Sequence, residues 1–159
     1  MENLIKLLEE NARYTNEELA VMLGTTPADI NSQIKSLEAS GVLKGYKAIV
    51  DKENHSNDYV VALIELKVAP KRGHGFDEIA CIIAEYPEVE DLYLMSGGFD
   101  LAVFLSGKSF KEIALFVSQR LAVLDSVIST ATHFVLSTYK SKGILMHETA
   151  KDERGQLGL

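Results

Sequence analysis

The feature that most constrains the fold is residues 15–51, where two short helices are predicted close together. Thr15 and Glu18 have the T-x-x-E spacing of a capping box, in which a hydroxyl and a carboxylate both accept backbone N–H groups at the start of a helix. Gly24 is predicted to end this helix, because glycine adopts the left-handed conformation without a Cβ clash. The apolar side chains between these signals share one helical face and are Leu19, Ala20 and Leu23.

A second helix begins two residues after the first one ends. Thr26 and Asp29 repeat the capping-box spacing, and Pro27 occupies the first helical position, where a missing N–H costs nothing. Gly41 is predicted to end this helix. Its apolar face consists of Ile30, Ile34 and Leu37. Two helices joined by so short a connection are typical of a helix-turn-helix, and residues 2–12 supply an amphipathic helix to pack behind them.

The outward face of the second helix predicts DNA contacts, because in a helix-turn-helix this helix lies in the major groove. Asn31 can pair with adenine, and Lys35 with guanine or a phosphate. Small polar residues are equally typical of a solvated helix face, so the pattern also fits a surface without a ligand. The candidate DNA-binding residues are Thr26, Ala28, Asn31, Ser32, Lys35, Ser36, Lys44 and Lys47.

The segment L-E-x-x-G-V-L-K-G-Y-K-A-I-V-D, residues 37–51, resembles the Lrp/AsnC (feast/famine) family of prokaryotic transcription regulators. The similarity extends over nearly the whole chain and is most specific in this segment. It implies a partner in double-stranded DNA and a C-terminal domain that binds an effector. It also implies homodimers that form through the sheet of that domain and often assemble into octamers.

A composition break marks the predicted domain boundary, because residues 51–58 contain no large apolar side chain. We therefore expect a winged helix-turn-helix domain over residues 1–51 and a linker over residues 52–58. An oligomerisation and effector-binding domain is expected over residues 59–159. Residues 42–50 alternate apolar and basic side chains and are predicted as a wing or a linking strand.

The second domain is predicted to be ferredoxin-like, with the order βαββαβ, which makes the whole chain α+β. Its expected strands span residues 59–69, 88–96, 99–106 and 127–139, and its expected helices span residues 76–86 and 109–121. The helices of this fold cover one face of the sheet. Because several strands are apolar on both faces, the uncovered face would form a large exposed patch on a monomer. The pattern therefore predicts a homodimer or a larger assembly.

The run Gly97-Gly98-Phe99-Asp100 resembles the G-x-D signature of the Lrp/AsnC family, which implies an amino-acid effector site there. Glycines leave backbone N–H groups open to a carboxylate, and Asp100 can pair with an ammonium group. The alternative is that the two glycines only form a tight hairpin, which Asp100 caps. The candidate effector-binding residues are Gly97, Gly98, Phe99, Asp100, Ser129, Thr130 and Thr132.

The charge of the chain predicts weak DNA binding by a single copy. The net charge is −7, and residues 1–51 contain five basic and eight acidic residues, a net charge of −3. Neutralisation of phosphates supplies much of the affinity of most DNA-binding proteins. Several weakly binding domains joined in one oligomer would raise the overall affinity through effective concentration.

The remaining composition bounds the environment of the protein. No apolar run reaches about 18 residues and no secretory signal is visible, so neither a membrane span nor export is expected. Cys81 is the only cysteine, which excludes an intramolecular disulfide and fits a reducing cytoplasm. Its place in an apolar helical pattern predicts a buried small side chain.

Two other classes of function remain open from the sequence. The acidic N-terminal domain and the single lysine of the recognition helix would also fit a small-molecule sensor or partner-binding protein with a vestigial helix-turn-helix. Some tetrapyrrole decarboxylases share the two-domain architecture, so the fold alone does not exclude an enzyme. The sequence shows no nucleophile–base pair, metal-ligand spacing or phosphate loop. We therefore expect no catalytic residues, metal or cofactor.

Overall fold

The computed structural model describes residues 1–55, 59–70 and 75–146. The chain divides into two compact units, Met1–Ile49 and Val50–Leu159. This division falls two residues before the predicted end of the first domain. Residues 56–58 of the predicted linker and the last residues of the chain, 147–159, lie outside the described part.

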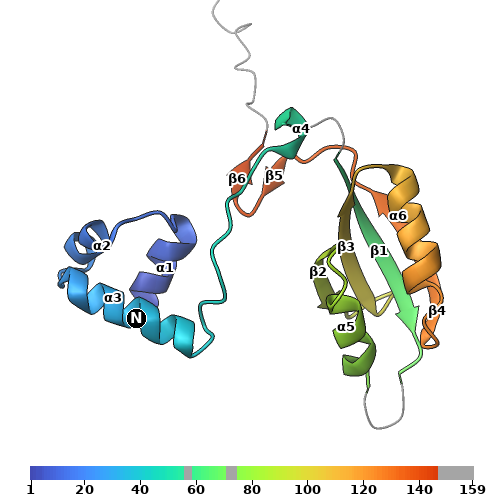
Figure 1. The fold of residues 1–159 in the computed structure, drawn as a ribbon, viewed down its shortest axis with the longest axis horizontal. Coiled ribbons are helices and arrows are strands. Elements are labelled where there is room, and N and C mark those ends of the chain that lie inside the picture. The colour runs from blue at the N-terminus through green and yellow to red at the C-terminus, as the bar shows by residue number, and fades with distance from the viewer. Residues whose placement is uncertain (56–58, 71–74, 147–159) are drawn as a thin grey trace, which may run out of the picture. The chain divides into compact units, whose positions relative to one another are not determined.

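The first unit is a bundle of three helices, as predicted (Figure 1). Its elements are α1 (Glu2–Glu10), α2 (Asn16–Leu23) and α3 (Pro27–Ala39). The buried core residues are those of the predicted apolar faces and are Leu4, Leu8, Leu19, Ala20, Ile30 and Leu37. Because Ile30 and Leu37 are buried, the opposite face of α3 is left exposed to solvent.

The helix caps explain where α2 and α3 begin. At α2 the predicted capping box is complete, since Thr15 Oγ1 accepts from Glu18 N–H (3.2 Å) and the Glu18 carboxylate accepts from Thr15 N–H (2.8 Å). At α3, Thr26 Oγ1 accepts from Asp29 N–H (3.2 Å). The Asp29 carboxylate, however, accepts from threonine hydroxyls instead of completing a second capping box.

Replacing Thr15 with alanine is expected to lower the free energy of unfolding by about 1 kcal/mol. The variant removes the acceptor for Glu18 N–H at the first turn of α2. Thermal unfolding followed by circular dichroism measures the change. Thr15→Ser restores the acceptor and should unfold like the unmodified chain, so equal losses in both variants would contradict the role of the cap.

The strand predicted over residues 42–50 is not formed. This segment is extended and, in the described part of the chain, it has no partner strand. Val42, Tyr46 and Val50 expose at least half of their surface. A strand needs a neighbour to pair its N–H and C=O groups, so alternation of side chains alone does not produce one.

The second unit has the predicted βαββαβ order, with a four-stranded sheet in the order β2-β3-β1-β4 and antiparallel pairing throughout. Its elements are β1 (Val60–Val68), α5 (Asp77–Ala84), β2 (Val89–Leu94), β3 (Leu101–Gly107), α6 (Phe110–Phe116) with its π-helical extension η1 (Val117–Leu121), and β4 (Val127–Phe134). The short helix α4 (Lys52–His55) precedes the sheet. A small hairpin of β5 (Lys140–Ser141) and β6 (Ile144–Leu145) follows it.

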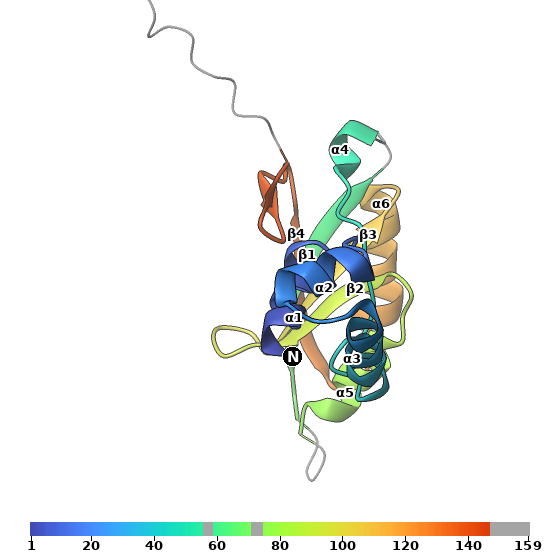
Figure 2. The same ribbon diagram turned by 90° about the vertical axis from the view of Figure 1, so that its left-hand side faces the viewer.

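The core of this unit lies between the sheet and the helices α5 and α6, which cover the same face (Figure 2). Alternate residues of β1, namely Ala62, Ile64 and Leu66, are fully buried there. The predicted alternation of β1 is therefore confirmed, and the odd-numbered residues lie on the other face. None of the helices in the described part of the chain is long and apolar enough to span a membrane.

Helix α4, which belongs to the second unit, is held in place by contacts with two other parts of that unit. Lys52 Nζ donates to Tyr59 Oη (2.7 Å) and lies 3.5 Å from Glu90 Oε1. The carboxylate of Glu53 accepts from Thr138 N–H (2.6 Å). Residues 52–53 of the predicted linker are therefore tied to the sheet and to the segment that follows β4.

Three local predictions are wrong. Gly97 and Gly98 do not form a two-residue turn, because β2 and β3 are joined by a wider loop closed by Met95 N–H and the Asp100 carbonyl (2.8 Å), so neither glycine needs a positive φ. Strand β4 ends at Phe134 and not at residue 139. Cys81 is exposed, because Ile79 and Ile83 direct the opposite face of α5 into the core.

Candidate DNA-contact surface and effector loop

The outward face of α3 gathers the predicted DNA contacts. The eight predicted residues are all exposed, and they are Thr26, Ala28, Asn31, Ser32, Lys35, Ser36, Lys44 and Lys47. The first six belong to α3 or its N-cap, and the last two belong to the extended segment after it. The buried Ile30 and Leu37 fix the rotation of α3 about its axis, so this polar face points to solvent.

The lysine that follows α3 folds back over the end of the helix. A Cβ placed on Gly41 would lie 3.0 Å from Lys44 Nζ. This position brings the ammonium close to the carbonyl end of α3, where the helix dipole favours a positive charge. Gly41 has φ +71°, which supports the sharp change of direction after α3.

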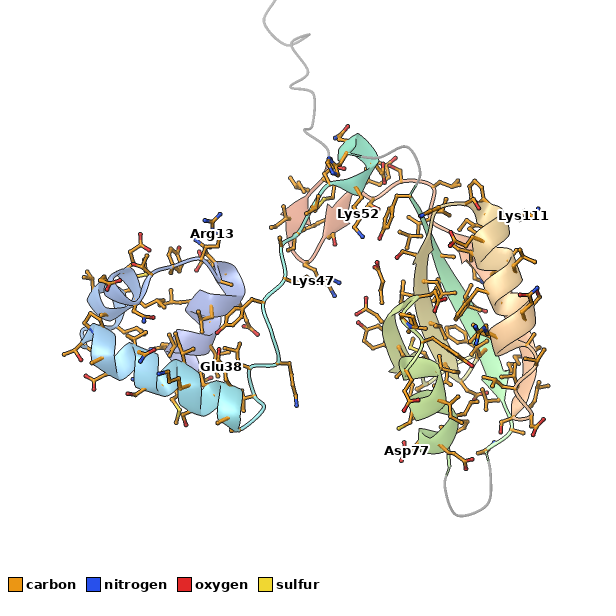
Figure 3. The ribbon with its side chains drawn as sticks, viewed as in Figure 1. Arg13, Glu38, Lys47, Lys52, Asp77 and Lys111 are labelled. Carbon is orange, nitrogen blue, oxygen red and sulfur yellow. The ribbon has the colours of Figure 1, made fainter. Side chains whose placement is uncertain are left out.

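One acidic residue of this surface was missed by the sequence reasoning. Tyr46 Oη donates to Glu38 Oε1 (3.0 Å), which ties the extended segment to α3. Glu38 is labelled in Figure 3. Partial burial, together with the hydrogen bond to Glu38, raises the pKa of Tyr46. Glu38 follows Lys35 by three residues on α3, so its carboxylate lies one helical turn from that lysine. The T-x-x-E spacing of a helix cap spans only three residues, so it gives no signal for a contact between residues eight apart.

The loop of the predicted effector site is open. Gly97 and Gly98 are exposed, and a Cβ at either position would meet no heavy atom within 4 Å. The side chain of Asp100, in contrast, is held by a hydrogen bond within the fold, since its Oδ2 accepts from Val68 N–H (2.8 Å). Asp100 N–H also donates to the Leu66 carbonyl (2.9 Å). Asp100 therefore fastens the start of β3 to the end of β1.

The hydroxyl residues of β4 do not share one face of the sheet. Thr130 and Thr132 pair with Leu66 and Ile64, so they lie on the helix-covered face. Ser129 pairs with Lys67 and lies on the uncovered face. Strand β1 separates all three from the loop at Gly97 and Gly98, because the sheet order is β2-β3-β1-β4.

The uncovered face of the sheet is apolar at its centre. Leu63 pairs with Phe104 on one side and with His133 on the other. The rings of Tyr93 and Phe104 pack edge to face with their centroids 6.2 Å apart. A polar pair adjoins this centre, since His133 Nε2 lies 3.3 Å from Glu65 Oε1. Among the described residues, no three His, Cys, Asp or Glu side chains come together as a metal site.

The helix-turn-helix bundle and the ferredoxin-like domain each match a family model. A family model described as winged helix-turn-helix DNA-binding matches residues 2–44. A second, described as the Lrp/AsnC ligand binding domain, matches residues 61–145. The chain belongs to the Lrp/AsnC family and is a DNA-binding transcription regulator of that type, not an enzyme.

Curated relatives show the same family. The chain is 42% identical over 152 residues to the uncharacterized HTH-type transcriptional regulator YugG of Bacillus subtilis. The aligned region covers 95% of this chain and 91% of the relative. It is 30% identical over 137 residues to the HTH-type transcriptional regulator FL11 of Pyrococcus horikoshii, covering 86% and 87% of the two chains.

Solved structures show the same fold. The transcriptional regulator NMB0573 of Neisseria meningitidis, crystallised as a complex with L-Met, matches with a TM-score of 0.70 at 24% identity, covering 87% of this chain and 88% of that one. Escherichia coli AsnC matches with a TM-score of 0.67 at 20% identity, covering 89% and 93%. These similarities confirm the predicted α+β fold class.

Proposed function

We propose that this regulator reads DNA through the outward face of α3, with Lys44 and Lys47 at the flanking phosphates. The observation that carries the proposal is the exposure of this polar face opposite the buried Ile30 and Leu37. Asn31 and Ser32 lie where a recognition helix contacts base edges, and Lys35 lies one turn further along.

The test is a titration of the full chain against a duplex selected from a random pool, repeated at several salt concentrations. Selective binding that weakens as salt rises is the expected result, because phosphate contacts release bound cations. Equal affinity for the selected duplex and for unrelated DNA at moderate salt would contradict a sequence-reading role for α3.

The uncovered face of the sheet is proposed to pair with the same face of a second copy. It places Leu63 and Phe104 beside each other, outside the helix-covered core. Burying this face against a second sheet removes apolar surface from water, at about 25 cal/mol per Å². Dimers of this kind then carry two DNA-binding units each, and further assembly of dimers into an octamer would multiply them again.

The proposed effector is an amino acid or a related small molecule, bound at the loop of Gly97 and Gly98. The open backbone of the loop can receive a carboxylate, and Asp100 adds a negative charge for an ammonium group. NMB0573 and a Mycobacterium tuberculosis feast or famine regulatory protein, both of this fold, have solved structures in complex with L-methionine. Because the loop is open, we expect another copy of the chain to complete the site. Phe99 is its proposed flanking residue. Ser129 lies beyond β1 in the same chain, so it would flank the site only from another copy, whereas Thr130 and Thr132 face the helix side.

Substitutions of Asp100 separate its structural role from its proposed ligand role. Asp100→Asn keeps an acceptor, though an uncharged one, for Val68 N–H, so the melting temperature should fall only slightly while amino-acid affinity falls about tenfold or more. Asp100→Ala leaves that N–H without its partner and should destabilise the fold by about 1–2 kcal/mol. Calorimetric titration with amino acids and thermal unfolding measure the two effects. Unchanged amino-acid affinity in Asp100→Asn would restrict Asp100 to its structural role.

A further inference from the structure

Glu90 holds the short helix α4, which ends the connection between the two units, against the sheet of the second unit. Glu90 Oε1, in β2, accepts from Tyr59 Oη (3.1 Å) and from Ser106 Oγ (2.7 Å). The same oxygen lies 3.5 Å from Lys52 Nζ. The Lys52 ammonium also lies 3.9 Å from the centre of the Tyr59 ring. Lys52 is therefore fastened both to the residue before β1 and to the start of β2.

The next residue of α4 is held by a different part of the same unit. Glu53 Oε1 accepts from Thr138 N–H (2.6 Å), and Glu53 Oε2 accepts from Ser137 Oγ (3.2 Å). One carboxylate thus takes two donors from the segment that follows β4. We call the whole arrangement the linker clamp, and its members are Lys52, Glu53, Tyr59, Glu90, Ser137 and Thr138.

The charges of the linker clamp keep it closed at neutral pH. Burial alone would lower the pKa of Lys52, but the hydrogen bond to Tyr59 and the charge of Glu90 outweigh it, and the pKa is raised. The ammonium therefore stays protonated. A hydrogen bond from a backbone N–H to a carboxylate, as at Thr138, is also stronger than one to a neutral acceptor.

The connecting chain is fastened at its other end as well. Tyr46 Oη donates to Glu38 Oε1, which attaches the extended segment to α3 within the first unit. Residues 47–50 are exposed and belong to no helix or strand. The free stretch of the connection is therefore short, because only the five residues 47–51 separate Tyr46 from Lys52.

The length of the free stretch limits how far the first unit can reach from the second. Five extended residues span at most about 18 Å. If the linker clamp opens, the free stretch runs over residues 47–59, and these thirteen residues span at most about 47 Å. One turn of DNA is about 34 Å long. The closed clamp therefore keeps the reach below one turn of DNA, and its loss raises the reach above one turn.

We propose that the linker clamp sets the spacing of the two DNA half-sites that an oligomer of this regulator accepts. This inference rests on the proposed reading of DNA by α3 in an oligomer, and it adds the residues that decide which spacings are tolerated. Lys52 and Glu53 act through the length of the free stretch and do not contact the duplex. Effective concentration falls roughly as the −3/2 power of tether length, so a change from five to thirteen residues lowers it about fourfold.

The diagnostic variant replaces Lys52 and Glu53 together with alanine. It removes both grips of the linker clamp, leaves the net charge of the chain unchanged and keeps a residue that favours a helix. The matched control is Glu85→Ala with Lys111→Ala, which removes the same two charges from exposed positions of the same unit. A third variant keeps the clamp and carries a flexible glycine–serine insertion after Ile49 that lengthens the free stretch to thirteen residues.

The experiment uses the four full-length chains, after thermal unfolding has shown that all are folded. It measures their affinity for one selected site and for pairs of that site with varied spacers. The unmodified chain and the control should prefer one spacing about tenfold or more over the same spacing lengthened by one turn. The clamp and insertion variants should lose about fourfold at that spacing and bind both spacings within about threefold. Affinity for the single site should be equal in all four chains, because the α3 surface is unchanged.

Several results would overturn the inference, and each identifies what has failed. If only the insertion broadens the accepted spacing, the free stretch sets the spacing but the clamp does not define its length. If neither variant broadens it, the spacing is set elsewhere in the oligomer. Loss of single-site affinity in the clamp variant alone would restrict Lys52 and Glu53 to a structural role. If the unmodified chain selects no sequence at all, the proposed reading of DNA by α3 fails, and the inference fails with it.

Discussion

Replacing Lys35, Lys44 and Lys47 together with glutamate will lower the affinity for the selected duplex by at least about a hundredfold near physiological salt. Each exposed lysine that neutralises a phosphate releases about 0.9 of a condensed cation, so the slope of log affinity against log salt should fall by about 2.7. Fluorescence titration at four or more salt concentrations measures both quantities. The loss is large because residues 1–51 contain only five basic side chains.

A control with the same change in net charge separates local contacts from general repulsion. Lys108, Lys111 and Lys140 are exposed on the second unit and can be replaced with glutamate in the same way. This control should keep most of its affinity and its salt slope. Equal losses in the two triple variants would show that net charge, and not the α3 surface, governs DNA binding. Full affinity in the first variant would show that the duplex is bound elsewhere on the chain and that the helix-turn-helix is vestigial.

Leu63→Lys on the uncovered face of the sheet is expected to convert the proposed oligomer to monomers and to weaken DNA binding by about a hundredfold to ten-thousandfold. An ammonium at the centre of two paired sheets would lose its hydration without a partner charge. Monomers then lose the gain in effective concentration that joins several weak DNA-binding units. Sedimentation velocity at micromolar concentration measures the first effect, and titration with the selected duplex measures the second.

The matched control for this prediction is Leu115→Lys on α6, which makes the same substitution at an outward position of the helix layer. This variant should remain oligomeric and bind DNA normally. Retention of the oligomer by both variants would show that the uncovered face is not the dimer interface. Loss of the oligomer in both variants would point to a general effect of an added lysine.

Local signals in the sequence were sufficient for several elements whose structure depends on neighbouring residues. The T-x-x-E spacing at Thr15 predicted the start of α2, because a cap is made within one turn. The alternation around Ile64 predicted which face of β1 is buried, because side chains alternate along any strand. The order of these elements then indicated the βαββαβ domain.

Predictions that depended on distant groups were less successful. Cys81 lies in an apolar run, yet it is exposed because α5 has only one covered face. The hydrogen bond from Val68 to Asp100 spans 32 residues, and no local spacing indicates it. The segment of residues 42–50 has the alternation of a strand, but a strand also requires a partner, which the described part of this chain does not supply.

The central claim is that this acidic chain binds DNA tightly because several copies of the chain present α3 to the duplex together. The most direct measurement is the mass of the complex between the full chain and its selected duplex, by sedimentation equilibrium at a protein concentration that half-saturates the DNA. The account predicts at least two chains on each duplex, and at least two chains in the free protein. A single chain that binds the selected duplex tightly, and is monomeric when free, would contradict it.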